Sequence, residues 1–317
     1  MKRIIPALLL CSATIATNAQ ADYPVRPITL VVPFPAGATT DTVARVVGQA
    51  ASAQLGQPIV IDNKPGAEGQ VAAQEVARAT PDGYRLLLAT SGNLSLVPTL
   101  RKKPPYDVLT DFTPIADVGR FGFFLYVNPA VPASNLKEFL AYAKANPGKL
   151  SYGTGNNTGV VAFSHFKTLT GIELTQVPYK GEPPAMLDLI AGRTQAMIGT
   201  TIGAPYLREG KLRALVSINA QRNSLLPDVP TLREAGMQDL EIMPWAGLVG
   251  PAGMPKDAVG RLNQAFVAAM NNPKVREQMD RLGFPLTPSS PEAFGRLIKH
   301  QLAVHGRLVK DAGLQPE

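Results

Sequence analysis

The chain has 317 residues, enough for two domains or one large domain, and 45% of them are hydrophobic while 17% are charged. This composition excludes a disordered chain, and the single Cys excludes a disulfide framework or a cluster of thiolate ligands within the chain. The formal net charge is +7, or +5 without Lys2 and Arg3, which suits an anionic small ligand. The Lys and Arg residues are scattered, which argues against nucleic acid as a partner.

The first 21 residues have the pattern of a secretory signal peptide. Lys and Arg at positions 2 and 3 form a basic start, residues 4–16 are an uncharged apolar stretch, and residues 19–21 (AQA) give the small-x-small pattern that precedes cleavage. We therefore expect the mature chain to begin near Asp22 and to be soluble and exported to the periplasm.

Two alternatives to this interpretation remain. A membrane anchor needs about 20 apolar residues to span a bilayer, which is more than the stretch provides, and Pro6 interrupts it. A lipoprotein would be cleaved before Cys11, but Leu10 stands where that cleavage requires a small residue. Cleavage after Ala21 is therefore the favoured interpretation.

Strands and helices alternate from the start of the mature chain. Residues 28–34 (ITLVVPF) are a β-branched run typical of a buried strand, and residues 39–55 follow with the apolar spacing of a helix. A strand over 58–62, a helix over 67–79 and a strand over 84–89 come next. This β-α-β-α-β order predicts a parallel sheet covered by helices on both faces.

A second group of the same kind lies between residues 134 and 217. Its expected helices cover 134–146, 158–170, 183–191 and 202–209, and its expected strands cover 150–152, 175–177, 194–198 and 213–217. A strand over 245–249 and helices over 255–271, 273–282 and 291–312 follow. The predicted architecture is therefore two α/β units with a cleft between them.

Three polar, glycine-bearing loops follow predicted strands and precede predicted helices, over residues 34–41, 90–93 and 153–158. In a parallel sheet such loops gather at the carboxyl edge of the strands, where ligands bind. The free N–H groups and partial positive charge of a helix N-terminus suit a carboxylate or a phosphate there. Ordinary helix capping by Thr and Asn is the alternative explanation of these loops.

The sequence contains no G-x-S-x-G elbow, H-E-x-x-H, P-loop or C-x-x-C pattern, so an enzyme is poorly supported. His300 and His305 fall in the charged last helix and are expected to face solvent, and His165 is expected to be structural. A secreted enzyme that uses Asp41 or Lys180 as acid or base is the rival hypothesis, although Asp41 is expected to support the first helix. We expect no catalytic residue, no cofactor and no metal site.

Short motifs occur in order over nearly the whole mature chain. Tyr23-Pro-x-Arg-Pro-Ile leads into Leu30-Val-Val-Pro-Phe-Pro-Ala-Gly37, and Asn63-Lys-Pro-Gly66-Ala, Pro81-Asp-Gly-Tyr84 and Val177-Pro-Tyr-Lys-Gly181 follow. Together these motifs closely resemble the Bug family, the periplasmic substrate-binding proteins of tripartite tricarboxylate transporters.

The resemblance implies a two-domain type II periplasmic binding protein, or Venus flytrap, in which each domain is a mostly parallel α/β sheet flanked by helices. Residues 22–121 plus 245–317 would form the first domain and residues 122–244 the second, with hinges near 122–127 and 243–249. The implied function is to bind a small organic carboxylate and deliver it, as a monomer, to a membrane permease. A solute sensor for a two-component system is the alternative.

The resemblance also implies where the ligand binds. In the family, one carboxylate is held mainly by backbone N–H groups and ordered waters from two loops, which correspond here to Phe34–Asp41 and Tyr152–Thr158. The ligand-binding residues implied in this way are Phe34, Gly37, Ala38, Thr39, Thr40, Asp41, Thr90, Ser91, Asn93, Tyr152, Thr154, Gly155, Asn156, Asn157, Thr158, Tyr179, Lys180, Gly181, Gly199 and Thr200.

Three positions depart from the family pattern. Ala38 stands where the first loop usually has a second Gly, Val160 stands where many relatives have His, and Gly199 stands where many have Asp. An Asp at that last position could pair with a ligand amine. Its absence argues against an amino-acid ligand and leaves more room in the cleft.

The processing of the chain gives the first testable prediction. Mass spectrometry of the protein recovered from the periplasm is expected to show an N-terminus near Asp22 and no attached lipid. A diacylglyceryl group on Cys11 would show instead that the chain is a lipoprotein.

Overall fold

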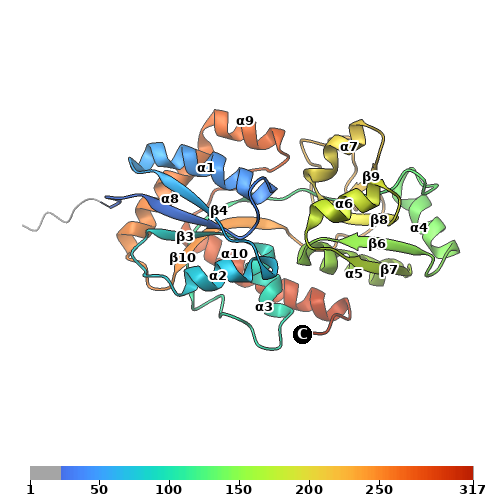
Figure 1. Ribbon diagram of the computed structural model, residues 1–317, viewed down its shortest axis with the longest axis horizontal. Helices are drawn as coiled ribbons and strands as arrows, with labels where there is room; N and C mark the ends of the chain where they lie inside the picture. Colours follow the sequence, from blue (N-terminus) through green and yellow to red (C-terminus); the bar gives the residue numbers. More distant parts are fainter. Residues whose placement is uncertain (1–22, 317) are drawn as a thin grey trace, which may run out of the picture.

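The structure is a computed structural model that describes residues 23–316, and it contains two five-stranded sheets, each packed between helices (Figure 1). The predicted signal peptide lies outside the described residues. We call the sheet that holds the N-terminal strand, together with its helices, the first lobe, and the other sheet with its helices the second lobe. No helix in residues 23–316 combines the length and the apolar character that crossing a membrane requires.

The first lobe is built on a sheet with the strand order β2-β1-β3-β10-β4. Its strands are β1 (Ile28–Val32), β2 (Ile59–Asn63), β3 (Arg85–Thr90), β4 (Phe112–Arg120) and β10 (Trp245–Pro251). β1 is parallel to β2 and β3, whereas β10 is antiparallel to β3 and β4. One strand against the common direction makes the sheet mixed, where the sequence pattern predicted a parallel one.

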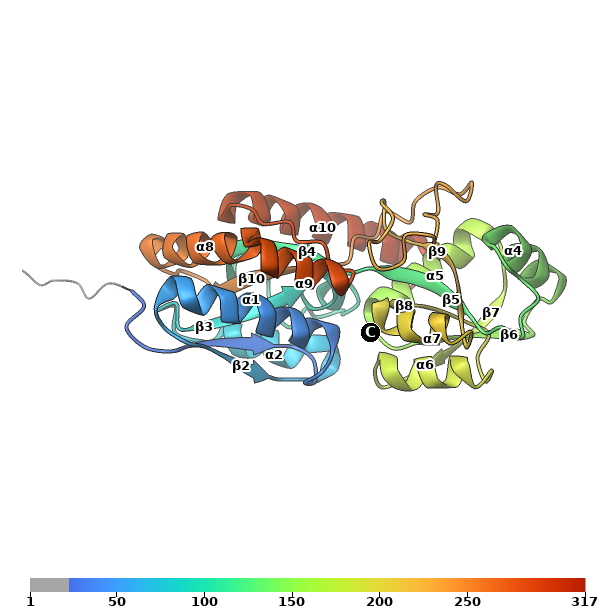
Figure 2. The same cartoon turned by 90° about the horizontal axis from the view of Figure 1, so that it is seen from above.

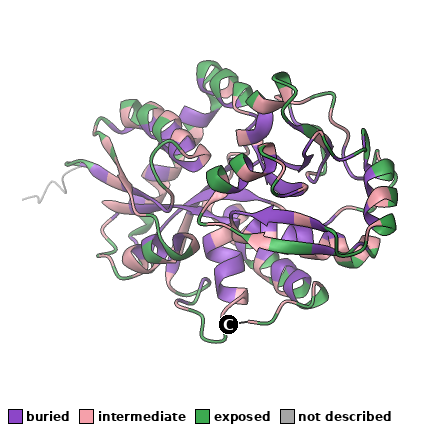
Figure 3. Cartoon of the chain, turned by 45° about the vertical axis from the view of Figure 1, so that its right-hand side comes forward, coloured by how far each residue is buried: buried purple, intermediate pink, exposed green. Residues whose placement is uncertain are grey.

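Helices cover both faces of this sheet because side chains alternate along its strands. The helices of the first lobe are α1 (Thr39–Leu55), η1 (Ala67–Gly69), α2 (Gln70–Ala77), η2 (Gly92–Leu96), α3 (Val97–Thr99), α8 (Lys256–Asn271), α9 (Pro273–Arg281) and α10 (Pro291–Asp311). Ile28, Leu30 and Val32 belong to one core cluster with α1 and α8, and Val31 belongs to another with α2 and α10. Figure 3 shows buried strands at the centre of the molecule and helices exposed on their outward faces, whereas the edge strands β2 and β7 are largely accessible.

The second lobe repeats this arrangement with the strand order β7-β6-β8-β5-β9, in which β5 is the antiparallel strand. Its strands are β5 (Phe123–Val127), β6 (Leu150–Thr154), β7 (Leu174–Pro178), β8 (Ala196–Thr200) and β9 (Arg213–Ser217). Its helices are α4 (Leu136–Ala145), α5 (Asn157–Thr170), α6 (Glu182–Ile190), η3 (Thr201–Gly203) and α7 (Ala204–Arg208). Phe163 of α5 and Met186 of α6 lie in separate core clusters, as two covered faces require.

The chain crosses between the lobes in two segments that lie side by side. β4 leads through Phe121 and Gly122 into β5, and the loop after β9 returns through Pro244 into β10 (Figure 2). Phe121 N donates a hydrogen bond of 2.9 Å to Pro244 O, so the two crossings are joined directly. The antiparallel strand of each sheet, β10 in the first lobe and β5 in the second, is the strand that the chain enters directly from the other lobe.

The hinge segments predicted from the sequence extend too far into the sheets. Residues 123–127 are β5 and residues 245–249 lie in β10, so only the first residues of each predicted hinge lie between the lobes. β4 is not expected from the sequence at all, because Pro114 and Gly119 interrupt its apolar pattern. Pro114 lies beside a register shift between β4 and β10, the kind of irregularity at which a strand tolerates proline.

The last helix buries one side chain that we expected to face solvent. His305 is 0% exposed, whereas His300 is exposed as expected. Phe294, Ile298 and His305 recur at helical spacing and share one face of α10, which packs against β4 and against α5 of the second lobe. Burial lowers the pKa of His305 to about 4, so its ring is neutral at pH 7.

Candidate functional site

Polar loops from both lobes meet where parallel strands end. In the first lobe the loops after β1 and β3 are close together, because a Cβ atom on Gly69 would lie 2.8 Å from Pro33 Cβ and 3.1 Å from Asn93 Cβ. In the second lobe the loop after β6 begins α5, and α5 contacts η2 of the first lobe. The strand ends that usually bind ligands in α/β sheets are thus brought to one place.

The first predicted loop is held in shape by the buried carboxylate of Asp41. Its Oδ2 accepts hydrogen bonds from Gly37 N (2.9 Å) and Arg45 Nε (3.0 Å), and its Oδ1 accepts one from Asn63 Nδ2 (2.9 Å). Asn63 Nδ2 also donates to Phe34 O (3.0 Å). Burial opposes ionisation of Asp41, but these hydrogen bonds outweigh burial and lower its pKa. Asp41 therefore supports the loop and the start of α1, as expected.

The N-terminus of α1 has no side-chain cap. Ala38 is the N-cap residue and offers no acceptor, so the N–H groups of the first turn, beginning at Thr39 and Thr40, receive no capping side chain. Gly37 precedes them with φ of +83°, a conformation that favours glycine, and its own N–H is used by Asp41. The first turn of α1 is thus a set of backbone donors without a side-chain acceptor.

Asn93 adds a buried donor on the same side. Its Oδ1 accepts from Thr90 N at 2.8 Å, while its Nδ2 is buried with no partner among the described residues. The segment that follows Ser91 is not an open loop, because Gly92–Leu96 forms a π-helical turn, a feature often found at functional sites. Asn93 is therefore a predicted site residue whose amide remains free for a ligand or a water molecule.

The third predicted loop begins α5 and packs tightly against α6. Asn156 caps α5, since its Oδ1 accepts from Gly159 N at 2.8 Å. A Cβ atom on Gly155 would lie 2.5 Å from Glu182 Cα, so only glycine fits there. Tyr152, by contrast, is buried with its ring stacked on Phe163 at 3.8 Å, which is a core contact.

The remaining predicted residues lie along the ends of β7 and β8. Tyr179 OH donates to Asp188 Oδ2 at 2.8 Å, and Lys180 is exposed. Thr154 and Thr158 are buried beside the α5 loop, and Gly181, with φ of +107°, is the N-cap of α6. Lys180 thus lies at the surface of this edge.

Glu182, which no sequence pattern indicates, lies between the loop before α5 and the end of β8. Its carboxylate accepts from Thr200 N and, at 2.9 Å, from Thr200 Oγ1. Burial raises the pKa of Glu182 to about 7, although the hydrogen bonds from Thr200 oppose that rise. A Cβ atom on Gly199 would lie 2.6 Å from Glu182 Oε1, so this carboxylate fills the space that a side chain at position 199 would occupy.

Glu68, also not expected from the sequence, links the two lobes. Its Oε2 accepts a hydrogen bond of 3.1 Å from Asn157 N, the first residue of α5. Burial raises the pKa of Glu68, and the hydrogen bond from Asn157 partly offsets that rise. Glu68 and Asn157 are 89 residues apart in the sequence, so no local sequence pattern indicates that they are in contact.

The titratable side chains form no metal centre. In residues 23–316 no three His, Cys, Asp or Glu side chains come together in a group that could hold a metal ion. His165 is half-buried on α5, and burial lowers its pKa. These observations agree with a structural role for His165.

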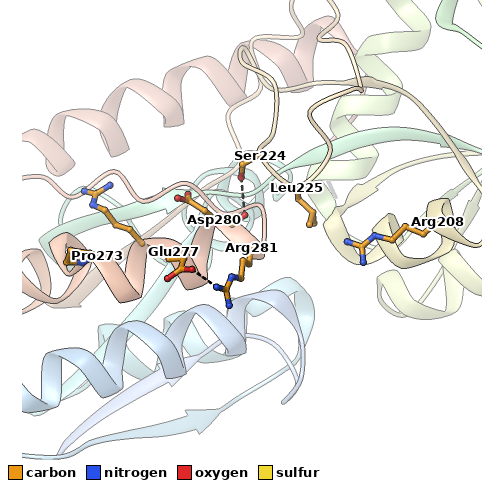
Figure 4. A pocket seen from close by; sticks show the side chains of 8 residues that line it. Arg208, Ser224, Leu225, Pro273, Glu277, Asp280 and Arg281 are labelled. Atoms are coloured by element: carbon orange, nitrogen blue, oxygen red, sulfur yellow. Dashed lines mark hydrogen bonds and ion pairs between the residues drawn. The ribbon is translucent and has the colours of Figure 1, made fainter.

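A cavity of about 820 Å³ lies elsewhere, between α7 of the second lobe and α9 of the first (Figure 4). Its lining contains none of the predicted site residues and consists of Arg208, Ser224, Leu225, Pro273, Arg276, Glu277, Asp280 and Arg281. Arg281 pairs with Glu277, and Arg276 donates to Asn271 Oδ1 at 2.8 Å. Three arginines, Arg208, Arg276 and Arg281, thus line this cavity.

Comparison with protein families and curated sequences gives consistent matches. The family described as tripartite tricarboxylate transporter family receptor matches residues 43–314. The chain is 37% identical over 305 residues to the UPF0065 protein in the gbd 5' region of Cupriavidus necator, covering 95% of this chain and 92% of that one. It is 32% identical over 316 residues to the protein BugT of Bordetella pertussis, covering 96% and 95%.

Solved structures agree with these sequence matches. The R. palustris protein Rpa4515 with adipate superposes with a TM-score of 0.87 at 34% identity, over 93% of this chain and 100% of that one. The periplasmic binding protein BugD gives 0.84 at 34% identity over the same shares. MatC from Rhodopseudomonas palustris with bound malate gives 0.82 at 33% identity, over 90% of this chain and 100% of that one.

The network around Asp41 gives a prediction about stability. Asp41→Asn replaces one carboxylate oxygen with an NH2 group and removes the charge, so at least one of the donors on Gly37, Arg45 and Asn63 loses its acceptor. We expect the free energy of unfolding at pH 7 to fall by about 1–3 kcal/mol. Because the folded-state pKa of Asp41 is lowered, its contribution is present above its ordinary value of 3.8 and is lost as the pH falls through the folded-state value. The difference between wild type and variant should therefore shrink in acid.

Urea denaturation followed by circular dichroism at several pH values measures this difference. Asp257→Asn is the matched control, because Asp257 is an exposed residue in the first turn of α8. Equal stabilities of the Asp41 and Asp257 variants at pH 7 would contradict the supporting role of Asp41.

Proposed function

The chain belongs to the tripartite tricarboxylate transporter receptor family, and we propose that it binds a small organic carboxylate outside the cytoplasm and delivers it to a membrane permease. The members and neighbours it matches are solute-binding receptors, not enzymes. The observation that carries the choice of ligand is that two solved neighbours, each aligned over at least 90% of this chain, bind adipate and malate.

The proposed ligand site lies between the lobes, at the loops after β1, β3 and β6. The first turn of α1 and the Nδ2 group of Asn93 offer donors from the first lobe, and the residues around Gly155 line the second. A hydrogen bond to a carboxylate contributes about 1.5–3 kcal/mol, and a helix N-terminus adds about 0.3–1 kcal/mol. A few backbone donors are therefore sufficient to bind a carboxylate without an arginine.

The proposed domains correspond to the lobes, with residues 22–121 plus 245–317 in the first and 122–244 in the second. Two short crossings joined by the hydrogen bond from Phe121 N to Pro244 O are suited to act as a hinge. Closure of the lobes over the ligand would present a new surface to the permease. A cleaved export signal, a periplasmic location and a monomeric state belong to the same proposal.

A thermal-shift screen of small carboxylates tests the proposed function. A carboxylate present at 100 times its Kd should raise the apparent stability by about 2.7 kcal/mol, and the amide of the same acid should not. If no carboxylate stabilises the protein, the proposed function is wrong.

If main-chain N–H groups hold the ligand carboxylate, a substitution that moves the loop should weaken binding more than one that removes a nearby cation. Gly155→Ala places a Cβ atom 2.5 Å from Glu182 Cα and must displace the loop, so we expect it to weaken binding of the carboxylate found by the screen by about tenfold or more. Lys180→Met removes only an exposed cation and should cost less than Gly155→Ala.

Isothermal titration calorimetry of variants that retain the wild-type circular dichroism spectrum decides between these mechanisms. Loss of binding in Lys180→Met together with normal binding in Gly155→Ala would show that a salt bridge, and not the main chain, holds the carboxylate.

A further inference from the structure

A carboxylate of the protein itself occupies the N-terminus of α5. Glu68 of the first lobe accepts a hydrogen bond from Asn157 N of the second lobe at 3.1 Å. Asn157 opens α5, and an N–H group there has no acceptor within the helix. The position at which a second-lobe helix would receive a ligand anion is therefore already taken by Glu68.

The backbone around Glu68 is shaped to bring this side chain to α5. Gly66, Ala67, Glu68 and Gly69 have φ angles of +139°, +45°, +58° and +84°. Side chains other than glycine are disfavoured in this region, so Ala67 and Glu68 hold an uncommon conformation. Gly69 fixes the turn against the first lobe, because a Cβ atom there would lie 2.8 Å from Pro33 Cβ.

No cation of the described part of the chain is paired with Glu68. Among residues 23–316 it takes part in no ion pair, and its one hydrogen bond comes from Asn157 N. Burial raises the pKa of Glu68, and the hydrogen bond from Asn157 N partly offsets that rise. Lys180, the cation that the sequence places at this edge, is exposed and forms no ion pair with Glu68 within the described residues.

A second unpaired carboxylate lies at the same edge of the second lobe. The backbone of Glu182 packs on Gly155, two residues before Asn157, and its carboxylate accepts from Thr200 N and Oγ1. Two carboxylates thus flank the start of α5, that of Glu68 from the first lobe and that of Glu182 from the second. Donors lie at the uncapped first turn of α1 and at Asn93 Nδ2.

We propose that Glu68 sets the ligand class of the proposed receptor, so that the site takes a monocarboxylate with a hydrogen-bond donor, most strongly an ammonium group, at its far end and rejects dicarboxylates. This inference rests on the proposed function. The ligand carboxylate binds to the first lobe, and its far end meets the carboxylate of Glu68 beside Asn157. A second carboxylate in that place, such as the far carboxylate of adipate or malate in the two neighbours, would face like charge. An amine there would instead find in Glu68 the negative partner that Gly199 does not provide.

Calorimetry with three series of unbranched acids tests this selectivity. The series are the dicarboxylates from succinate to suberate, the ω-amino acids of the same chain lengths and the corresponding alkanoates. Wild type should bind the best ω-amino acid at least about tenfold more tightly than the best dicarboxylate. Glu68→Gln, which keeps the shape and removes the charge, should reduce that preference by about tenfold or more.

Two further variants serve as controls, one for the backbone conformation at position 68 and one for the general effect of removing a negative charge. Glu68→Gly suits the left-handed backbone at this position, so it should fold and show the same change of preference as Glu68→Gln. Glu173→Gln removes the charge of an exposed glutamate of the second lobe and should leave the preference unchanged. A thermal melt of each variant confirms that it is folded.

The outcomes separate the two proposals. If wild type binds dicarboxylates as tightly as ω-amino acids, or if the preference is the same in wild type and both Glu68 variants, the role of Glu68 is wrong while the receptor function stands. If wild type binds no member of any series and no carboxylate of the wider screen, the receptor function fails and the inference fails with it.

Discussion

The hydrogen bond from Phe121 N to Pro244 O joins the two places where the chain passes between the lobes, and the rest of the architecture depends on this double crossing. The chain enters β5 and β10 from the opposite lobe, and each of these strands is antiparallel to both of its neighbours. Each sheet therefore has this strand in the fourth position of an otherwise equivalent strand order. The other strands of each sheet then share one direction, and their polar loops collect at one edge. A ligand site built from both lobes follows from that topology.

The chemistry of the site is set by how the carboxylates of Asp41, Glu68 and Glu182 are satisfied. Asp41 is buried, yet hydrogen bonds from Gly37, Arg45 and Asn63 keep its pKa low, and they hold the first loop beside the uncapped start of α1. Among residues 23–316, Glu68 of the first lobe and Glu182 of the second have only uncharged hydrogen-bond donors as partners, and burial raises the pKa of both. Donors thus lie at the start of α1 and at Asn93, and carboxylates lie around the start of α5, an asymmetry that gives a bound solute a preferred orientation.

Local patterns predict the helices well and the site only in part. The spacing of apolar residues predicts α1 over residues 39–55 as found, and the motifs that resemble the Bug family are confirmed by the family match and by the similarity to BugT and BugD. The sequence does not indicate β4 because Pro114 and Gly119 break its apolar pattern. It does not indicate the burial of His305 because α10 meets β4, η2 and α5 only in the folded chain. Glu68 and Glu182 could not be predicted as site residues, because their hydrogen-bond partners Asn157 and Thr200 are brought to them only by folding.

A crystal structure of the protein with the carboxylate that stabilises it most is the most direct test of this account. We expect electron density for the carboxylate between the first turn of α1 and the Gly155–Asn157 segment, with at least two main-chain N–H groups within hydrogen-bond distance. A carboxylate bound instead to Arg208, Arg276 or Arg281 in the cavity between α7 and α9 would contradict main-chain recognition between the lobes.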